Sequence, residues 1–460
     1  MLWSITVAVC ILFLTYKWIK TSRPKNIPPG PTAIPLLGNL LSMGRRPEYK
    51  VLEWKKKYGD IFSMYSGRKL AVVLSDFYTV RKVFNEDVAA GRPTNNPSRN
   101  DYPVRPDGLG LLACQGELWK VHRRFALSTL RDLGMGKNWL EDTIIAEVEG
   151  LCQAMRDTKQ QPFNPKVPVT NSVSNVICAL SFGQRFELTD PKFSRLTMLI
   201  AKIISAIKLD YVMANLPFLQ WFPNPIRSGI AQARRNRADL LAFFREKIHE
   251  HNAAACDPST GLPDYLYAYQ HEKETGEKTD VPELFTEAQL TSSLYDLFIA
   301  GTDTTSTTIL LAMILMVENP EVVKKAQEEI DTTFGRETVL TYSDRARLPY
   351  TEATIMEIQR YGSIVPLNVP HKANEDLQID GYTIPKGTLL VANALSIHRD
   401  PRWWNNPDEF DPTRFLDSNG KLTKPDGFLP FCIDPPYIMT AVKDSVCSHN
   451  ILADIKRSNK

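Results

Sequence analysis

A polar patch interrupts an otherwise apolar stretch of the sequence at residues 300–308, which read Ala-Gly-Thr-Asp-Thr-Thr-Ser-Thr-Thr. Glycine lets a large group approach the backbone, and hydroxyl side chains can bond to helix carbonyls and distort the hydrogen-bond ladder. Asp303 beside Thr304 therefore has the chemistry of a proton relay. The alternative interpretation is a kinked helix whose threonines satisfy their own hydroxyl groups.

A carboxylate and a guanidinium lie three residues apart at Glu357 and Arg360. On a helix this spacing places both side chains on one face, where they can pair. On a solvated face such a pair contributes under about 1 kcal/mol, so the spacing alone indicates only a surface ion pair. Arg414, within residues 410–415, offers a second cation for the same carboxylate.

Side chains suited to an anionic ligand occur at several places. Trp119 and Arg123 are four residues apart, so a helix would present them on one face, from which they could bind an anion. Arg92 and His371 are further candidate donors. The alternative interpretation is a basic helix exposed to water.

Composition narrows the class of protein. The seven cysteines are odd in number and form no C-x-x-C pair, which argues against a disulfide framework and a zinc site and indicates a reducing compartment. The 460 residues include 55 basic and 52 acidic ones, a net charge of +3. So small an excess gives no reason to expect a nucleic acid partner.

Residues 1–20 have the pattern of an N-terminal membrane anchor. The stretch is mainly apolar and is followed by basic residues, and a span needs about 20 apolar residues. No basic region precedes it and no A-x-A site follows it, which disfavours a cleaved signal peptide. The basic residues on its C-terminal side place the body in the cytosol. A Pro-rich hinge, residues 21–38, would then fix the angle between body and bilayer.

Helical patterns dominate residues 117–330. A capping box at Thr286 and Gln289 predicts the start of a helix that runs to about Asn319 and stops at Pro320. Its length of roughly 30 residues makes it the expected central element, since helices average about 11–12 residues. The polar stretch 251–285 is expected to be an irregular, exposed connection.

Strand patterns lie toward the two ends of the chain. We expect a buried strand at 69–75, another at 388–394, and a hairpin at 377–384 that turns at Asp380-Gly381. Residues 401–431 are rich in proline and aromatic residues, which suits a meandering loop. The expected fold class is mainly α with a smaller β portion (α+β).

The order of these motifs resembles the cytochrome P-450 superfamily. A Pro-rich hinge, W-x-x-x-R, A-G-x-D-T-T, E-x-x-R and F-D-P-x-R-F follow one another from the anchor to Phe431. Residues 28–38 and 119–136 are most similar to the microsomal family 2 branch. The resemblance implies a cytochrome P-450 catalytic domain over residues 39–431, incomplete at its C-terminus. It also implies a haem b cofactor and insertion of one oxygen atom from O2 into a lipophilic small molecule.

The resemblance assigns roles to the motif residues. Asp303 and Thr304 would deliver protons to dioxygen at the haem. A buried ion network that positions the haem-binding loop would consist of Glu357, Arg360 and Arg414. The haem propionates would be bound by Arg92, Trp119, Arg123 and His371. The substrate pocket would be lined by residues 93–115, 193–223 and 364–369.

The resemblance further implies partners and a location. Electrons would come from NADPH through a flavoprotein, NADPH–cytochrome P-450 reductase, with cytochrome b5 as a further candidate donor. An acidic reductase would dock on basic residues of one region, Lys120, Arg124, Arg131 and Lys137. We expect the protein in the endoplasmic reticulum membrane, held by a single N-terminal anchor, with residues 216–222 dipping into the membrane surface.

The resemblance breaks after Phe431. The family pattern F-x-x-G-x-R-x-C-x-G requires Gly, Arg, Cys and Gly at positions where this chain has Asp434, Pro436, Ile438 and Thr440. The cysteine that would ligate the iron is thus replaced by Ile438, and no metal ligand is predicted. Cys432, six residues early, is the nearest substitute, and Cys447 is nine residues late. Residues 432–460 are interpreted as a divergent tail that replaces the haem-thiolate loop and the elements after it.

Two functions remain open from the sequence. The first is a haem-thiolate monooxygenase that is inactive as written, because the axial thiolate is what favours O–O cleavage. The second is a non-catalytic, membrane-anchored isoform that competes for the reductase or for substrate. An alternative transcript end or a gene-model artefact would also explain the break.

Overall fold

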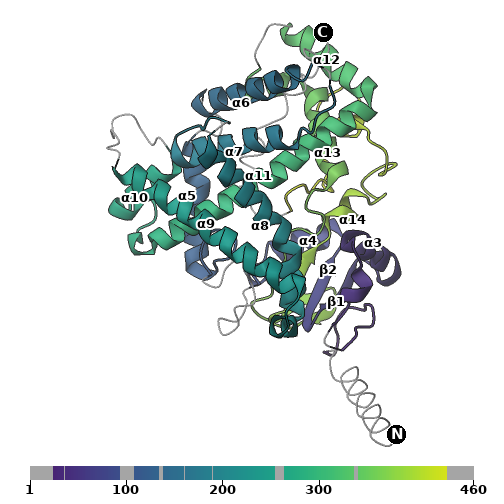
Figure 1. The fold of residues 1–460 in the computed structure, drawn as a ribbon. Coiled ribbons are helices and arrows are strands. Elements are labelled where there is room, and N and C mark those ends of the chain that lie inside the picture. The colour runs from purple at the N-terminus through teal and green to yellow at the C-terminus, as the bar shows by residue number, and fades with distance from the viewer. Residues whose placement is uncertain are drawn as a thin grey trace, which may run out of the picture.

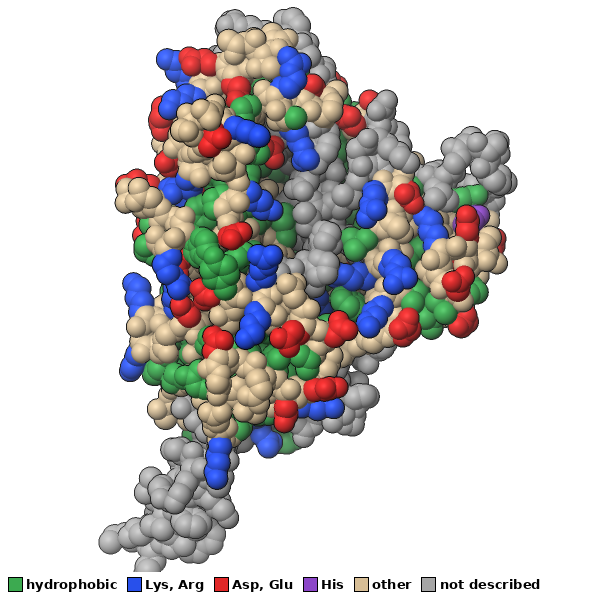
Figure 2. All heavy atoms as spheres, turned by 180° about the vertical axis from the view of Figure 1, so that it is seen from behind, with side chains coloured by type: hydrophobic (Ala, Val, Ile, Leu, Met, Phe, Trp, Pro, Cys, Tyr) green, Lys and Arg blue, Asp and Glu red, His purple; other side chains and the backbone are tan. Residues whose placement is uncertain are grey.

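The fold combines a large helical body with a small sheet at one end, beside α3 and α4 (Figure 1). The computed structural model describes residues 24–35, 37–93, 108–133, 138–159, 161–188, 190–253, 264–335 and 340–432. Within these residues helices predominate and strands are short, which confirms the expected α+β class. Basic and acidic side chains are interspersed on the face shown in Figure 2, in keeping with the small net charge.

The elements follow one another along the chain in a mainly helical order. The α-helices are α2 (Leu40–Met43), α3 (Pro47–Tyr58), α4 (Phe77–Phe84), α5 (Gly116–Asp132), α6 (Asn138–Arg156), α7 (Lys166–Phe182), α8 (Pro191–Asn215), α9 (Pro225–Ala253), α10 (Tyr265–Thr275), α11 (Glu287–Glu318), α12 (Pro320–Phe334), α13 (Pro349–Gly362) and α14 (Ala394–His398). The 3-10 helices are η1 (Asp87–Ala89), η2 (Pro217–Trp221), η4 (Pro282–Leu284), η5 (Tyr342–Arg347) and η6 (Pro412–Phe415). The strands are β1 (Ile61–Ser66), β2 (Lys69–Leu74), β3 (His371–Lys372), β4 (Leu377–Ile379), β5 (Tyr382–Ile384) and β6 (Leu389–Ala392).

The main sheet joins the two ends of the chain in the order β1-β2-β6-β3. β1 and β2 form an antiparallel hairpin, and β2 pairs in parallel with β6, with Ala71 opposite Leu389. β4 and β5 form the predicted hairpin, whose turn residues Asp380 and Gly381 have φ values of 45° and 84°. Two positive φ values in a two-residue loop match the right-handed twist of the strands, and glycine tolerates them best.

α11 is the central helix, with the predicted bounds. The Thr286 side chain accepts the backbone N–H of Gln289 at 3.2 Å, and Asn319 ends the helix before Pro320 begins α12. The reciprocal half of the expected capping box is absent among the described contacts of Gln289, whose amide instead bonds to the backbone of Gly110. α11 is the described helix that is long and apolar enough to cross a membrane, but it packs along α7 and α9 in the largest apolar cluster.

The expectation of an irregular connection over 251–285 was wrong. α9 extends to Ala253, and α10 occupies Tyr265–Thr275. Asp264 caps α10 by accepting the N–H of Tyr267 at 2.8 Å, and Gly276 ends it with a φ of 63°. The rings of Tyr265 and Tyr269 are buried in the core. The stretch looked polar because these rings carry hydroxyl groups, although most of their surface is apolar.

The Pro-rich segment, from Pro28 onward, is attached to the sheet. The backbone N–H of Ser63 donates to the carbonyl of Pro29, and its hydroxyl donates to that of Pro28, both at 2.7 Å. Asn39 then bonds to the backbone of Tyr65 in both directions. This part of the segment is therefore held rigidly against β1. The predicted anchor, residues 1–20, lies outside the described residues.

Gly30 gives a test of this attachment. A β-carbon on Gly30 would overlap the backbone carbonyl of Ser63, so Gly30→Ala should lower the free energy of unfolding by about 1–3 kcal/mol. Gly150→Ala, on α6, is the matched control because nothing lies within 4 Å of its added carbon. Because alanine is the better helix former, the control should be neutral or stabilising. Urea unfolding of both variants measures the difference, and a Gly30→Ala protein as stable as the parent would contradict it.

Candidate functional site: a buried ion network and candidate anion-binding side chains

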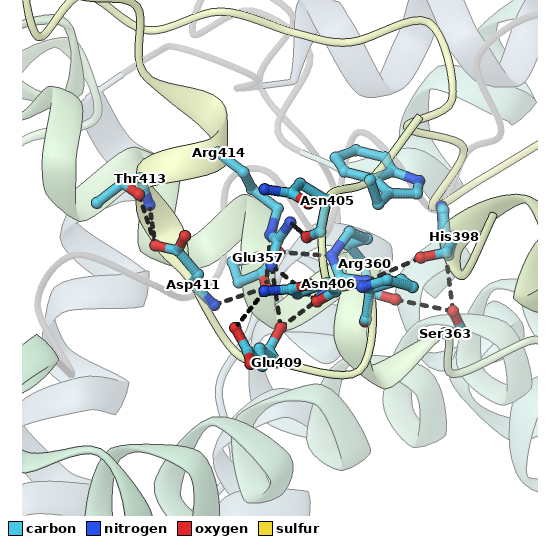
Figure 3. A network of polar contacts seen from close by, with 12 residues as sticks. Glu357, Arg360, Ser363, His398, Asn405, Asn406, Glu409, Asp411, Thr413 and Arg414 are labelled. Carbon is cyan, nitrogen blue, oxygen red and sulfur yellow. Dashed lines mark hydrogen bonds and ion pairs between the residues drawn. The ribbon is translucent and has the colours of Figure 1, made fainter. Parts of the chain in front are cut away.

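The carboxylate of Glu357, on α13, is the centre of a buried ion network (Figure 3). Arg360 donates to it twice, from Nε to Oε2 and from Nη2 to Oε1, both at 2.7 Å. Arg414, from η6, donates its Nε to Oε1 at 3.1 Å, and the backbone N–H of Asp411 adds a fourth bond at 2.9 Å. The side chains of Glu357 and Arg360 are 0% exposed. The surface interpretation of this pair therefore does not apply.

The remaining N–H groups of the two arginines bind backbone carbonyls of the loop after α14. Arg360 donates to His398 and Pro407 at 2.8 Å each and to Glu409 at 3.0 Å. Arg414 donates to Asn405 at 2.7 Å and also to Glu409 at 3.1 Å. Buried charges are stable only when their hydrogen-bonding capacity is met. Here the loop meets it, and the charges in turn fix the loop.

No local sequence pattern marks the next members of this network. His398, on α14, is buried and bonds to the hydroxyl of Ser363 and to the backbone N–H of Leu429. His398 and Leu429 do not stand at a sequence spacing that marks a site, because only the fold brings them to α13. A lone histidine in an unclassified loop could not have been assigned to the network from sequence.

The polar patch of α11 forms a continuous helix whose hydroxyls bond to its own backbone. Thr304 donates to the carbonyl of Ala300 and Thr308 to that of Thr304, both at 2.8 Å, and Ser306 donates to Thr302 at 2.6 Å. This agrees with the self-satisfied threonines of the alternative interpretation, but without a break in the helix. Thr304 would have to rotate its hydroxyl to donate a proton elsewhere.

Asp303 lies on the accessible side of α11. Nearby protein displaces part of its water and raises the pKa of its carboxyl above the ordinary value, while the positive charge of Lys166 acts in the opposite direction. A raised pKa increases the fraction of the acid form near neutral pH. The environment therefore suits a group that donates and regains protons.

Arg92 and His371 lie together at the edge of the main sheet. The backbone N–H of Lys372 donates to the carbonyl of Gly91 at 2.7 Å, so the residues before Arg92 run along β3. His371 Nδ1 bonds to the carbonyl of Ala89 at 2.8 Å. Both side chains are buried, with 3% exposed.

Trp119 and Arg123 share one face of α5. The guanidinium carbon of Arg123 lies 5.0 Å from the centroid of the Trp119 ring. The indole Nε1 of Trp119 is buried and donates to no described atom. The Lys372 ammonium bonds to Gln115, directly before α5, at 3.5 Å and so connects this helix to β3. A buried N–H without a partner costs about 1–3 kcal/mol, and an anionic ligand would satisfy it.

The side-chain chemistry of these four residues is compatible with an anionic group such as a haem propionate. Ile438, at the expected ligand position, lies outside the described residues, and its side chain has no lone pair to donate. The described residues contain no group of three His, Cys, Asp or Glu side chains that could hold a metal ion. Cys432, the candidate substitute, packs against the apolar cluster of the sheet with a φ of 65°.

Residues 108–115, in the first of the three segments expected to line the pocket, are held by two side chains of α11 that the motifs did not reveal. The carboxylate of Asp296 accepts the backbone N–H groups of Leu111 and Leu112 at 2.7 and 2.8 Å. Gln289 bonds to both backbone groups of Gly110, at 2.7 and 3.1 Å. Gln289 and Asp296 are seven residues apart, and this helical spacing carries no distinctive signal. Residues 94–107 lie outside the described residues.

Comparison with known proteins gives consistent matches over most of the chain. The family model described as Cytochrome P450 matches residues 28–433. The chain is 36% identical to mouse cytochrome P450 2U1 over 92% of its own length and 83% of that relative. It is 36% identical to cytochrome P450 18a1 of Drosophila melanogaster over 88% of its length and 76% of that relative. It is 35% identical to human cytochrome P450 2J2 over 94% of its length and 84% of that relative.

The ion network predicts a large effect of one neutral substitution. Glu357→Gln removes the charge that compensates two buried guanidiniums, so it should lower the free energy of unfolding by about 3–5 kcal/mol. Glu328→Gln is the control, because Glu328 faces Lys324 at 3.8 Å with 62% of its side chain exposed. The control should change stability by less than about 1 kcal/mol. Equal losses in urea unfolding would show that Glu357 has no special role.

Proposed function

Because this chain belongs to the cytochrome P-450 family, we propose that it is a monooxygenase scaffold for lipophilic small molecules that does not sustain turnover with its present sequence after Phe431. The contrast between the complete network around Glu357 and Ile438 at the thiolate position carries this proposal. The network holds the loop that leads to the haem ligand in the family pattern, yet the ligand itself is replaced.

A haem with an axial thiolate supplies the electron-rich iron at which dioxygen is cleaved. In this chain, Arg92, Trp119, Arg123 and His371 would bind the propionates, as the buried Trp119 N–H supports. Asp303 would hold a proton beside Thr304. Without a thiolate at position 438, the iron of a bound haem would not be competent to cleave dioxygen. We therefore expect ligand binding without catalysis.

We place the protein at the endoplasmic reticulum membrane, with residues 1–20 as its anchor. Trp221 and Phe222, which are 73% and 60% exposed, support contact of this region with the membrane surface. Family membership implies an external electron donor. The exposed side chains of Lys120, Arg124 and Arg131, opposite the buried face of α5, support docking of acidic NADPH–cytochrome P-450 reductase or cytochrome b5.

The second candidate function is competition by a non-catalytic, membrane-anchored isoform. The retained basic face of α5 favours it, because a reductase could dock there whether or not the partner turns over. Such a protein would lower the activity of complete relatives in the same membrane by occupying the reductase or the substrate.

The haem state can be measured directly. We expect the purified full chain, reduced and treated with carbon monoxide, to lack the Soret band of a thiolate-ligated haem, because Ile438 cannot ligate iron. A complete relative such as mouse cytochrome P450 2U1, prepared in parallel, is the positive control. Appearance of the thiolate band would overturn the proposed inactivity, and Cys432→Ser and Cys447→Ser variants would then identify the ligand.

Competition can be measured with a complete relative and limiting reductase in lipid vesicles. The chain should reduce substrate oxidation, and added reductase should restore it. Lys120→Glu with Arg124→Glu should weaken this inhibition several-fold, because it reverses the charge of the proposed docking face. Lys324→Glu with Lys325→Glu, at exposed positions of α12, is the charge-matched control. Two results would contradict reductase docking. The first is that added substrate, but not added reductase, relieves the inhibition. The second is that the docking-face variant and the α12 control variant inhibit equally.

A further inference from the structure

His398 lies between the ion network and the last described segment of the chain, residues 427–432. We infer that His398 is a positioning residue, which holds the backbone at Leu429 against the network and so fixes where this segment lies relative to α13. The inference deepens the proposed function and rests on it, because the segment leads to the loop that carries the thiolate in the family pattern.

The hydrogen bonds of His398 define which ring nitrogen carries the proton. The backbone N–H of Leu429 donates to Nε2 at 2.9 Å, so Nε2 is the unprotonated acceptor. The ring proton is therefore on Nδ1, which donates to the Ser363 hydroxyl at 2.8 Å. That hydroxyl donates to the carbonyl of Arg360 at 2.9 Å, and Arg360 in turn donates to the carbonyl of His398. Three of these bonds close a ring through His398, Ser363 and Arg360 (Figure 3), and the fourth attaches Leu429 to that ring.

Ser363 is placed for this path by the end of α13. It is the C-cap residue, with a left-handed backbone at a φ of 38°. Its hydroxyl is buried between the carbonyl of Arg360 and the ring of His398. A non-glycine residue with positive φ carries a conformational cost. The two hydrogen bonds of the side chain offset this cost.

The surroundings keep His398 in the neutral form that can accept the Leu429 N–H. The ring is buried against Phe428, with centroids 6.1 Å apart. Burial and the positive charge of Arg360 lower the pKa of His398 to about 3. Two further charged groups lie close by: Glu357, which pairs with Arg360, and Lys424, whose ammonium lies 5.7 Å from the Phe428 ring.

The segment itself has local hydrogen bonds on either side of Leu429. The N–H of Phe428 donates to Pro425, and that of Cys432 donates to Leu429. These bonds shape turns but do not fix where the turns lie relative to α13. The bond from Leu429 to His398 connects the segment to a residue that Arg360 already holds, so it transmits the position of the ion network.

Two substitutions separate the two nitrogens of His398. In His398→Gln, the side-chain oxygen can reach the position of Nε2 and accept the Leu429 N–H. In His398→Asn, the amide can replace Nδ1 toward Ser363 but cannot reach Leu429. In the full chain, His398→Asn should speed amide hydrogen exchange of residues 427–431 about tenfold relative to wild type, whereas His398→Gln should stay near wild type.

The peptide covering β1 and β2 is the internal control for this measurement. It should exchange at the wild-type rate in both variants. The inference is overturned if His398→Asn leaves residues 427–431 unchanged. It is also overturned if the two variants speed exchange equally, or if the β1–β2 peptide accelerates to the same extent, since each result would show a general loss of stability.

The pH dependence of stability gives a second readout. Between about pH 6.5 and pH 3 the unfolded chain binds a proton at His398 that the folded chain excludes, so His398 makes stability fall as the pH falls through this window. His398→Gln should remove this part of the slope. An identical pH profile for wild type and variant would contradict a neutral His398. Neither measurement needs bound haem, so failure here is distinct from failure of the monooxygenase scaffold, which the carbon monoxide spectrum judges.

Discussion

A single carboxylate, that of Glu357, determines how α13, η6 and the loop between α14 and η6 are organised. Removing it from water is costly, and the cost is met only because two guanidiniums and a backbone N–H converge on it. The guanidiniums carry more donors than one carboxylate can accept, so the surplus turns to backbone carbonyls. Those carbonyls belong to a loop with little regular structure, which gains fixed geometry without forming a helix or strand. The arginines that neutralise the Glu357 carboxylate are therefore also the residues that hold the loop in place.

Side chains of α11 hold a second irregular segment, residues 110–112, by binding its backbone. The helix contributes Gln289 and Asp296 to the backbone of residues 110–112, directly ahead of α5. It also carries the polar patch with Asp303 and Thr304 two turns farther along. The position of α5, and with it the Trp119 N–H, therefore depends on the same helix that presents the acid. Polar side chains on a central, mostly apolar helix tie these regions together.

Features set by neighbouring residues were predictable from sequence, and features set by distant ones were not. The bounds of α11 and the turn at Asp380 depend on local capping and local φ preferences, so their signals are continuous in the chain. Burial of Glu357 depends on a loop some fifty residues away, and the spacing alone favoured the wrong, exposed interpretation. α10 was missed because its buried face is made of tyrosines. His398 has no local signature, since its partners come from other elements. Propionate binding by Arg92, Trp119, Arg123 and His371 was proposed through family resemblance and stays a prediction.

The parallel pairing of β2 with β6 can form only after most of the chain has been synthesised. Ala71 meets Leu389, roughly 320 residues later, so at about 5–20 residues per second the ribosome needs roughly 15–60 s to supply the partner. During that interval the β1–β2 hairpin has a free edge that can pair with other chains. Attachment of the Pro-rich segment at Ser63 blocks part of the opposite edge early. Among the described residues, β6 is the strand that covers the β2 edge, so that edge has to stay unpaired until β6 is made.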